Sequence, residues 1–236
     1  MRVAALVPAY QAAPWLGDVL ARLRMLESPP HVLVVDDGSR DATAQVAREG
    51  GVAVLSFAGN RGKGAALRAG FDQLREFDAV VTLDADGQHP PECIPAFVRA
   101  AEGGADVVLG ARERSVAMPR LRRFANAFSS AWASAIAGQS IRDSQCGFRL
   151  FRRAVLDRTP MSAGRYEVES EMVVRAARLG FRFAEISIPT VYEGESHLTL
   201  VRDVPRIVGM MSRLTLERLV PPRELRQALR DGSERA

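Results

Sequence analysis

Lysine is almost missing from this chain: of the 32 basic residues among its 236 residues, only Lys63 is a lysine. The positive charge is therefore carried by arginine, whose planar guanidinium can grip a phosphate through two parallel hydrogen bonds. Cysteine is equally scarce, and Cys93 and Cys146 form neither a CxxC pair nor a zinc-binding pattern. We expect both to be reduced thiols, as in cytosolic proteins, rather than a structural disulfide.

Long hydrophobic runs are missing as well. No stretch approaches the ~18 apolar residues that span a bilayer, since the nearest candidate, residues 124–138, is interrupted by Asn126 and by serines. The apolar run at the N-terminus ends at Pro8 and is too short for the apolar region of a secretory signal peptide. We therefore expect a cytoplasmic protein that is peripheral wherever it meets a membrane.

The composition that is present fits a folded globular protein. Apolar residues make up 47% of the chain and charged residues 25%, which is typical of globular domains. The net charge of +4 and an isoelectric point of about 9.6 favour anionic molecules or an anionic membrane surface as partners.

Strand-like and helix-like segments alternate along the first half of the chain, with short connections between them. This alternation predicts a mostly parallel, doubly wound α/β sheet with flanking helices. The expected strands are Val3–Val7, Val32–Val35, Val52–Phe57, Ala79–Leu83 and Val107–Leu109, and the expected helices are Pro14–Leu26, Asp41–Glu49, Gly62–Leu74 and one opened by Pro90 and Pro91.

The second half has a more mixed pattern. Because it holds neither an internal repeat nor a linker, we expect one domain over residues 1–220 and a polar, charged tail over residues 221–236. The expected elements are a helix Leu121–Ala137, a short segment Cys146–Phe151, a helix Val168–Leu179, a strand Phe183–Ile188 and an amphipathic helix Val204–Leu219.

The segment that says most about function is Asp84-Ala85-Asp86-Gly87-Gln88. It closes the apolar strand Ala79–Leu83, and open α/β sheets bind ligands at the carboxyl ends of their strands. Its carboxylate and amide oxygens suit a hard cation, Mg²⁺ or Mn²⁺, which would in turn bind a diphosphate. The same residues also fit an ordinary strand-to-turn transition, because Asp and Gly are common in turns.

Two other loops carry polar residues at the expected ligand edge. Asp36 and Asp37 follow the second strand and can accept hydrogen bonds from a nucleobase and a ribose, while Asp41 is expected to cap the next helix. The loop Gly59–Gly64, with the letters GNRGKG, precedes the third helix, and a helix N-terminus attracts anions. It lacks the spacing of a P-loop, and a plain glycine-rich turn is the alternative.

Taken together, these segments resemble a known family. Pro8-Ala9-Tyr10, VVDDGSRDAT, GNRGKGAALRAGF, TLDADGQHPPE and GAR are similar, in order and spacing, to motifs of the inverting family-2 glycosyltransferases of GT-A fold. The branch they resemble contains the dolichyl-phosphate mannose synthases and the polyprenyl-phosphate glycosyltransferases. The resemblance runs from about Val3 to His197, which is most of the chain.

The resemblance implies roles for particular residues. It places Pro8, Tyr10, Asp36, Asp37 and Lys63 at the nucleotide, Asp84 at the ribose or the metal, and Asp86 and Gln88 on the cation itself. It further implies that Arg112 and Arg149 hold the acceptor phosphate and the donor diphosphate, and that Ser196 and His197 lie near the pyrophosphate. His197 stands where a lysine is common, and the family's Asn-Glu after the tyrosine is Gln11-Ala12 here.

The implied function is metal-dependent, inverting transfer of a hexose from a nucleotide-diphosphate sugar, of the GDP-mannose or UDP-glucose type, to a polyprenyl phosphate. The alternative is transfer to a hydroxyl of a soluble glycan, small molecule or protein, with Asp143 as the base. A lipid phosphate is already anionic and needs no base but needs cations, so the many arginines favour it. No nucleic acid is expected among the partners.

A polyprenyl acceptor lies in a bilayer, so we expect contact with a membrane surface or with a membrane-anchored partner. In the helix Val204–Leu219, arginines 206, 213 and 218 surround an apolar face, which fits a helix lying among lipid headgroups. The alternative is that this face packs on the rest of the protein. The face is formed by Val204, Ile207, Val208, Met211, Leu214 and Leu219.

Overall fold

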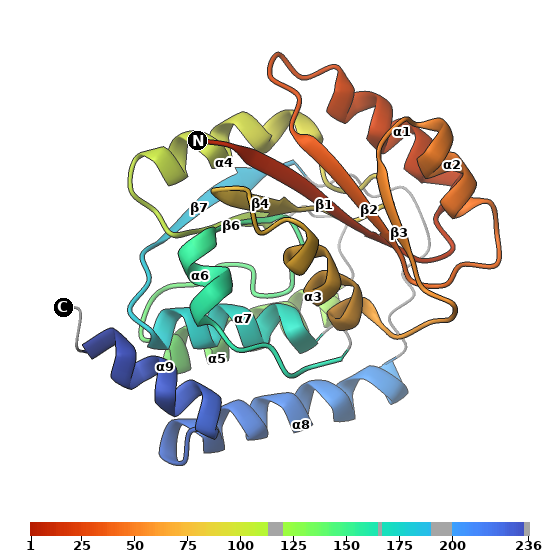
Figure 1. Cartoon of the computed structure of the whole chain (residues 1–236). Coiled ribbons are helices and arrows are strands. Elements are labelled where there is room, and N and C mark those ends of the chain that lie inside the picture. The colour runs from red at the N-terminus through yellow and green to blue at the C-terminus, as the bar shows by residue number, and fades with distance from the viewer. Residues whose placement is uncertain (113–119, 165–166, 190–199, 234–236) are drawn as a thin grey trace.

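The computed structural model describes residues 1–112, 120–164, 167–189 and 200–233 (Figure 1). Its centre is a seven-stranded sheet with the strand order β3-β2-β1-β4-β6-β5-β7. All strand pairs are parallel except those made by β6, which runs antiparallel to both β4 and β5. The mostly parallel sheet predicted from the sequence is confirmed. The strands are β1 (Val3–Ala9), β2 (His31–Asp36), β3 (Ala53–Ser56), β4 (Ala79–Thr82), β5 (Val107–Arg112), β6 (Arg149–Arg152) and β7 (Phe183–Ile188).

Helices cover both faces of the sheet, as a doubly wound arrangement requires. One face packs against α1 (Ala13–Arg24), α2 (Thr43–Glu49) and α4 (Ile94–Glu102), with Leu16, Ala47 and Phe97 among the buried contacts. The 3-10 turn η1 (Pro91–Cys93) leads into α4. The other face packs against α3 (Lys63–Gln73), α5 (Arg120–Ala137), α6 (Arg153–Arg158) and α7 (Glu167–Arg178).

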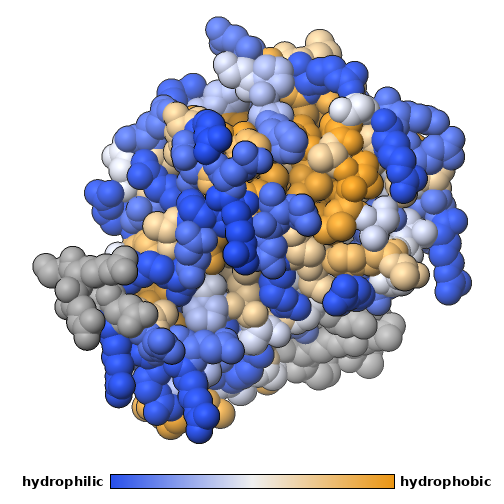
Figure 2. Space-filling model, viewed as in Figure 1, coloured by the Kyte–Doolittle hydropathy of each residue, from blue (hydrophilic) through white to orange (hydrophobic). Residues whose placement is uncertain are grey.

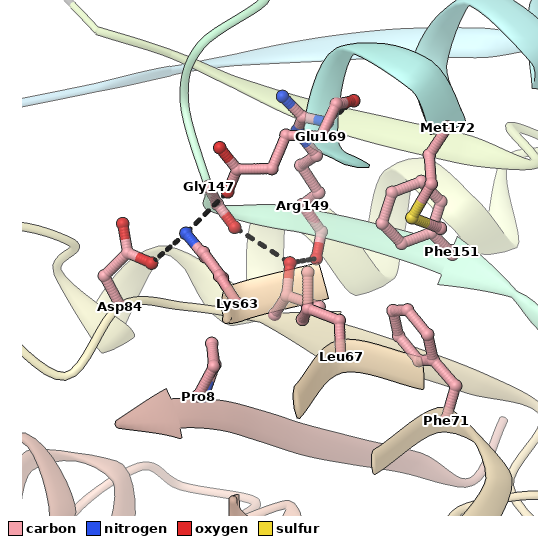
Figure 3. Close-up of a pocket in the computed structure, with 11 residues that line it drawn as sticks. Pro8, Lys63, Leu67, Phe71, Asp84, Gly147, Arg149, Phe151, Glu169 and Met172 are labelled. Atoms are coloured by element: carbon pink, nitrogen blue, oxygen red, sulfur yellow. Dashed lines mark hydrogen bonds and ion pairs between the residues drawn. The ribbon is translucent and has the colours of Figure 1, made fainter. Parts of the chain in front are cut away.

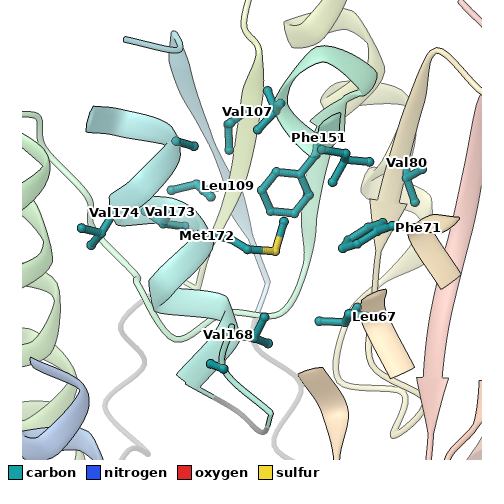
Figure 4. Close-up of a cluster of buried hydrophobic side chains, with 14 of the residues drawn as sticks. Leu67, Phe71, Val80, Val107, Leu109, Phe151, Val168, Met172, Val173 and Val174 are labelled. Carbon is teal, nitrogen blue, oxygen red and sulfur yellow. The ribbon is translucent and has the colours of Figure 1, made fainter. Parts of the chain in front are cut away.

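Helix α7 lies at the centre of the second face. Met172 of α7 meets Phe71 of α3, Phe151 of β6 and Val80 of β4 in one hydrophobic cluster (Figure 4). All residues from Val168 to Ala177 are buried, including the charged residues Glu169, Glu171 and Arg175. Charged side chains in a helix that is buried on all sides need partners of opposite charge. Glu169 pairs with Lys63 of α3, and Arg175 pairs with Glu171 of the same helix.

Helix α8 (Leu200–Leu219) packs on α7 and α5 through Met210, Met211 and Leu214, all of them buried. The apolar face expected from the sequence is therefore divided: Met211 and Leu214 form core, whereas Val208 and Leu219 are 52% and 78% exposed. None of the helices in the described ranges combines the length and apolar composition that crossing a bilayer requires.

The chain continues into α9 (Arg223–Ser233), which lies across the end of α8 (Figure 1). This helix falls in the stretch that the sequence marks only as a polar, charged tail, and its Leu225 is completely buried. The division of the chain at residue 220 stays a prediction.

Candidate active site

The polar residues singled out in the sequence meet at one edge of the sheet. Strands β1, β2, β4 and β5 are parallel, so the residues at their carboxyl ends share this edge. Strand β6 runs the other way, and its first residue, Arg149, pairs with Thr82 at the end of β4. The loop Ser144–Phe148 in front of β6 therefore also lies at the ligand edge.

At the middle of this edge the chain's single lysine lies between two carboxylates. Lys63 Nζ is 2.5 Å from Asp84 Oδ1 and 2.6 Å from Glu169 Oε1 (Figure 3). The three residues come from the start of α3, the end of β4 and the first turn of α7. The two carboxylates outweigh the effect of burial and raise the pKa of Lys63 well above its usual range. The ammonium is therefore charged at any working pH.

Sequence reasoning missed Glu169. It lies 106 residues from Lys63 along the chain, and no motif marks it. Only the packing of α7 against α3 brings the two together. Glu169 is one of three glutamates near the start of α7, and nothing in the sequence distinguishes it from Glu167 or Glu171.

Gly147 packs directly on these three charged groups. A Cβ atom added to Gly147 would lie 2.8 Å from Glu169 Oε1 and 2.9 Å from both Asp84 Oδ2 and Lys63 Nζ. The loop before β6 thus closes over the lysine at a distance that only glycine permits. Beneath it, an apolar floor that includes Pro8, Leu67 and Phe71 lines a small pocket (Figure 3).

His89 supports Asp84 from the opposite side. The backbone N–H of Asp84 donates to His89 Nδ1 at 3.0 Å, so the ring proton resides on Nε2, which lies 3.7 Å from Cys146 Sγ. Burial lowers the pKa of His89, which fits this neutral form. Burial by itself would raise the pKa of Asp84. The charge of Lys63 and its hydrogen bond outweigh this effect and lower the pKa to about 2. His89 is a second residue whose role the sequence did not indicate.

Asp86 and Gln88 belong to the turn after β4. Asp86 Oδ1 accepts a hydrogen bond from the Gln88 N–H at 3.0 Å, and Gly87 has the positive φ of +76° that this turn uses. Burial, together with the nearby Asp84 charge, raises the pKa of Asp86. A cation next to this carboxylate would stabilise its ionised form.

These residues fit part of a Mg²⁺ or Mn²⁺ site. Within the described ranges, no group of three His, Cys, Asp or Glu side chains is placed to hold a metal ion. Mg²⁺ in proteins is often held by one or two carboxylates, with substrate phosphates and water completing its shell. Asp86 can supply such a carboxylate and Gln88 an amide oxygen, whereas one oxygen of Asp84 is already bonded to Lys63.

Asp36 and Asp37 lie under the loops rather than at the surface, each 4% exposed. Asp36 Oδ1 accepts from the Ser39 N–H at 3.0 Å, and Asp37 accepts from the N–H groups of Arg61 and Gly62 at 2.6 and 2.8 Å. In the structure, Asp37 thus joins the end of β2 to the loop that precedes Lys63.

The end of β1 is joined to the same region. Gln11, the only non-glycine residue in the described ranges with a positive φ (53°), accepts hydrogen bonds at Oε1 from the N–H groups of Arg40 and Asp41. Asp41 in turn accepts from the Thr43 N–H at the start of α2, but the N-cap position expected for Asp41 is held by Ala42, which makes no side-chain cap hydrogen bond. Tyr10 is 49% exposed beside this junction.

Arg112 and Asp143 form a two-bonded ion pair at the end of β5. Arg112 Nε and Nη2 donate to the two Asp143 oxygens at 2.7 and 3.1 Å, and the Gln145 N–H donates to the same carboxylate at 3.1 Å. Burial raises the pKa of Asp143, but the Arg112 hydrogen bonds and charge lower it below its ordinary value. A carboxylate held in this way is a weak base.

Arg149 requires a correction of the direct phosphate role expected from the sequence. Its side chain is 2% exposed, and all three guanidinium nitrogens donate to backbone carbonyls, of Cys146 at 2.7 Å, of Ser144 at 2.8 Å and of Glu169. Because each of its three nitrogens is bonded to a backbone carbonyl and its side chain is buried, Arg149 holds the loop before β6 against α7. Ser196 and His197 lie outside the described residues.

Comparison with known proteins identifies the family to which the chain is similar. The family model described as Glycosyl transferase family 2 matches residues 4–159. The undecaprenyl-phosphate mannosyltransferase of Micrococcus luteus is 33% identical over 84% of this chain and 88% of the relative. The polyprenol monophosphomannose synthase of Mycolicibacterium smegmatis is 31% identical over 79% of this chain and 76% of the relative.

A solved structure shows the same fold. Glucosyl-3-phosphoglycerate synthase from Mycobacterium tuberculosis, in complex with Mn²⁺, UDP and glucosyl-3-phosphoglycerate, superposes with a TM-score of 0.71 at 18% identity. The match covers 93% of this chain and 80% of that one. The GT-A fold expected from the sequence is confirmed.

Proposed function

The chain belongs to glycosyl transferase family 2 and is a glycosyltransferase, and we propose that it moves a hexose from a nucleotide-diphosphate sugar to a polyprenyl phosphate. The observation that carries this proposal is the similarity, over about four fifths of the chain, to relatives named undecaprenyl-phosphate mannosyltransferase and polyprenol monophosphomannose synthase. Two features of the site support it.

The first feature is the state of Asp143. Transfer to a hydroxyl needs a base that accepts the acceptor's proton in the transition state. Asp143 is bound to Arg112 through both oxygens and has a lowered pKa, so it is poorly suited to that role. A phosphate oxygen is already anionic and attacks without a base. The geometry therefore favours the phosphate acceptor over the hydroxyl.

The second feature is the supply of positive charge and N–H donors at the same edge. Lys63 lies at the N-terminus of α3, where the positive end of the helix dipole also favours anions. Arg112 is 17% exposed at the end of β5. We infer that Arg112 approaches the acceptor phosphate, and that Asp36, Asp37 and Tyr10 line the nucleotide's place.

We further infer that Asp86 and Gln88 hold a Mg²⁺ or Mn²⁺ ion together with the donor's diphosphate. The chemistry that a bound cation supplies is neutralisation of the charge that develops on the leaving nucleoside diphosphate. Lys63 keeps Asp84 ionised and fixed beside this place, while Glu169 and Gly147 fix Lys63. Attack from the face opposite the leaving group inverts the sugar's anomeric centre. We place this reaction at the cytoplasmic face of a membrane, where the acceptor's phosphate meets water.

The experiment is a panel of nucleotide sugars incubated with the enzyme, Mn²⁺ and a short polyprenyl phosphate, with release of nucleoside diphosphate as the readout. We expect release with one class of donor, dependent on both acceptor and cation, and loss of at least about 100-fold in Asp86→Ala. The control Asp72→Ala removes an exposed carboxylate of α3 that is paired only with Arg75 in the described structure, and should retain full activity. Full activity of Asp86→Ala, or of the wild type in excess chelator, would contradict the cation role.

A further inference from the structure

An apolar corner is exposed where α8 meets α9. Leu216, Leu219 and Val220 are 63%, 78% and 71% exposed, and Pro221 and Pro222 follow them directly. We call these five residues the α8–α9 corner. Covering a branched apolar side chain from water is worth about 1.5–3 kcal/mol, so a cluster of three at one exposed turn is a feature that needs a partner.

The α8–α9 corner does not belong to the side of α8 that packs on the protein core. Met210, Met211 and Leu214 form that side and are buried against α5 and α7. The exposed residues Val208, Ser212, Leu216 and Leu219 follow each other at four- and three-residue steps, which places them along one outward stripe. Helix α8 therefore presents one apolar face to the protein and a second one, ending at the corner, to the outside.

Arginines surround the corner. Arg218, Arg223, Arg226 and Arg230 are exposed around it, and Arg226 donates from Nη2 to the Pro221 carbonyl at 3.0 Å, which fixes its guanidinium beside the proline turn. Glu217 does not offset this charge, because it points inward to Arg175 at 2.7 Å, whereas the exposed Glu224 offsets one of the four positive charges. Figure 2 shows hydrophilic side chains gathered over α9, with hydrophobic atoms at the lower edge of the molecule beneath them.

We propose that the α8–α9 corner inserts into the headgroup region of an anionic bilayer. An apolar tip within a ring of arginines combines the two contributions that hold peripheral proteins on such surfaces, which are apolar burial and roughly 1 kcal/mol for each basic residue near the lipid charge. The proposal rests on the proposed function, since a polyprenyl phosphate acceptor has to be met at a bilayer.

The core-facing side of α8 connects the corner to the active site. Arg175 of α7 donates to Glu217 of α8 at 2.7 and 3.1 Å and lies 3.0 Å from Glu171, while Arg213 of α8 donates to Glu171 at 2.7 Å. The same α7 carries Glu169, which holds Lys63. Docking at the corner would thus fix the position of the site relative to the membrane surface.

The test is co-sedimentation of the full chain with vesicles of phosphatidylcholine, with and without phosphatidylglycerol. We expect binding to the anionic vesicles that weakens with salt, and a loss of about tenfold or more in the variant Leu216→Ser, Leu219→Ser, Val220→Ser. The matched control is Met25→Ser, which changes an apolar side chain that is 84% exposed at the end of α1 and should bind like the wild type. A second variant, Arg223→Gln, Arg226→Gln, Arg230→Gln, should lose the preference for anionic lipid while folding normally.

Several results would overturn the assignment. These are wild-type protein that stays in the supernatant with anionic vesicles, a triple-serine variant that binds as well as the wild type, or a dimer in solution that the triple-serine change dissociates. Transfer to a short, water-soluble polyprenyl phosphate without vesicles tests the proposed function separately. Vesicle binding without such transfer would leave the corner assigned and refute the function, and transfer without vesicle binding would do the reverse.

Discussion

At the scale of single residues, the chain's one lysine is the group on which the site's arrangement depends. A compact ammonium fits between two carboxylates that lie on either side of it, where the wide, planar guanidinium used everywhere else in this chain would not. Removing Lys63 leaves Asp84 and Glu169 without the ammonium that is paired with both of them. Lys63 therefore holds Asp84 and Glu169 in place in addition to supplying a positive charge.

We therefore expect Lys63→Met to destabilise the fold by about 3–5 kcal/mol, the usual cost of leaving buried charge unpaired. Adding Glu169→Gln should recover part of the loss, because one of the two opposing charges is removed with little change of shape. Urea unfolding at neutral pH measures both values. A double variant that is less stable than the single one would show that the two carboxylates do not repel each other in the folded protein.

We expect that no residue with a side chain can replace Gly147 without a loss of activity. Gly147→Ala places a methyl group among the three charged groups, and a shift of about 1 Å in a reacting arrangement can cost about 100-fold in rate. We expect a loss of that size in kcat/KM with a folded protein by circular dichroism. Gly164→Ala, where a Cβ meets nothing within 4 Å, is the control and should keep its activity.

The Arg112–Asp143 pair predicts a dependence of stability on pH. Asp143 has a folded pKa below its ordinary value of 3.8, so the stability it adds is fully present above that value and is lost as the pH falls through the folded pKa. Unfolding free energies measured between about pH 6 and about pH 3 should fall more steeply for the wild type than for Asp143→Asn. Equal slopes would mean that the pair adds nothing to the folded state.

At the scale of the elements, α7 links the site to the outer helices through buried charge. Arg175 is 2% exposed and bonds Glu217 as well as the Pro160 carbonyl, and Glu171, which is completely buried, accepts from the N–H groups of Ser162 and Ala163. The same loop touches α3, because the Gly64 N–H donates to the Gly164 carbonyl at 3.1 Å. A disturbance of the α7–α8 contact can therefore reach the residue next to Lys63.

Arg175→Met should cost about 3–5 kcal/mol, because it leaves Glu171 and Glu217 buried with one cation fewer. The control is Arg182→Met, since Arg182 is 72% exposed and lies 3.7 Å from Asp106, so its removal should cost at most about 0.5 kcal/mol. Thermal and urea unfolding report both. Similar losses in the two variants would show that burial does not govern these pairs.

The sequence predicted those elements whose signals are local. The apolar strands β1, β2 and β4 and the glycine-rich start of α3 lie where their patterns indicate, because each signal is complete within ten residues or so. The segment Cys146–Phe151 gave no sign that β6 would run antiparallel between β4 and β5, since strand direction depends on partners far along the chain. Helix α9 was not predicted, because its composition is dominated by charge, and Leu225 is its one fully buried apolar residue among the side chains that the structure describes.

The same distinction explains the site. Asp84, Asp86 and Lys63 stand in short motifs and were singled out, whereas Glu169 and the supporting role of His89 follow from contacts that only the folded chain makes. Arg149 was misassigned for a related reason: a sequence shows that an arginine is present but not that its donors are used by backbone carbonyls.

At the scale of the whole molecule, the chain combines a GT-A fold, a site that holds Lys63 and Arg112, and an apolar, arginine-lined corner at the α8–α9 turn. The proposed lipid phosphate acceptor relates these features, because a phosphate would need no base, which fits the Arg112-bound Asp143, and a lipid would bring the exposed corner to a bilayer.

The most direct measurement is mass spectrometry of the lipid products after incubation with a productive nucleotide sugar and two acceptors of equal chain length, a polyprenyl phosphate and the corresponding polyprenol. We expect a glycosylated phosphate product of inverted anomeric configuration and no product from the alcohol. Glycosylation of the polyprenol, or of a soluble hydroxyl acceptor at a comparable rate with no product from the phosphate, would contradict this expectation.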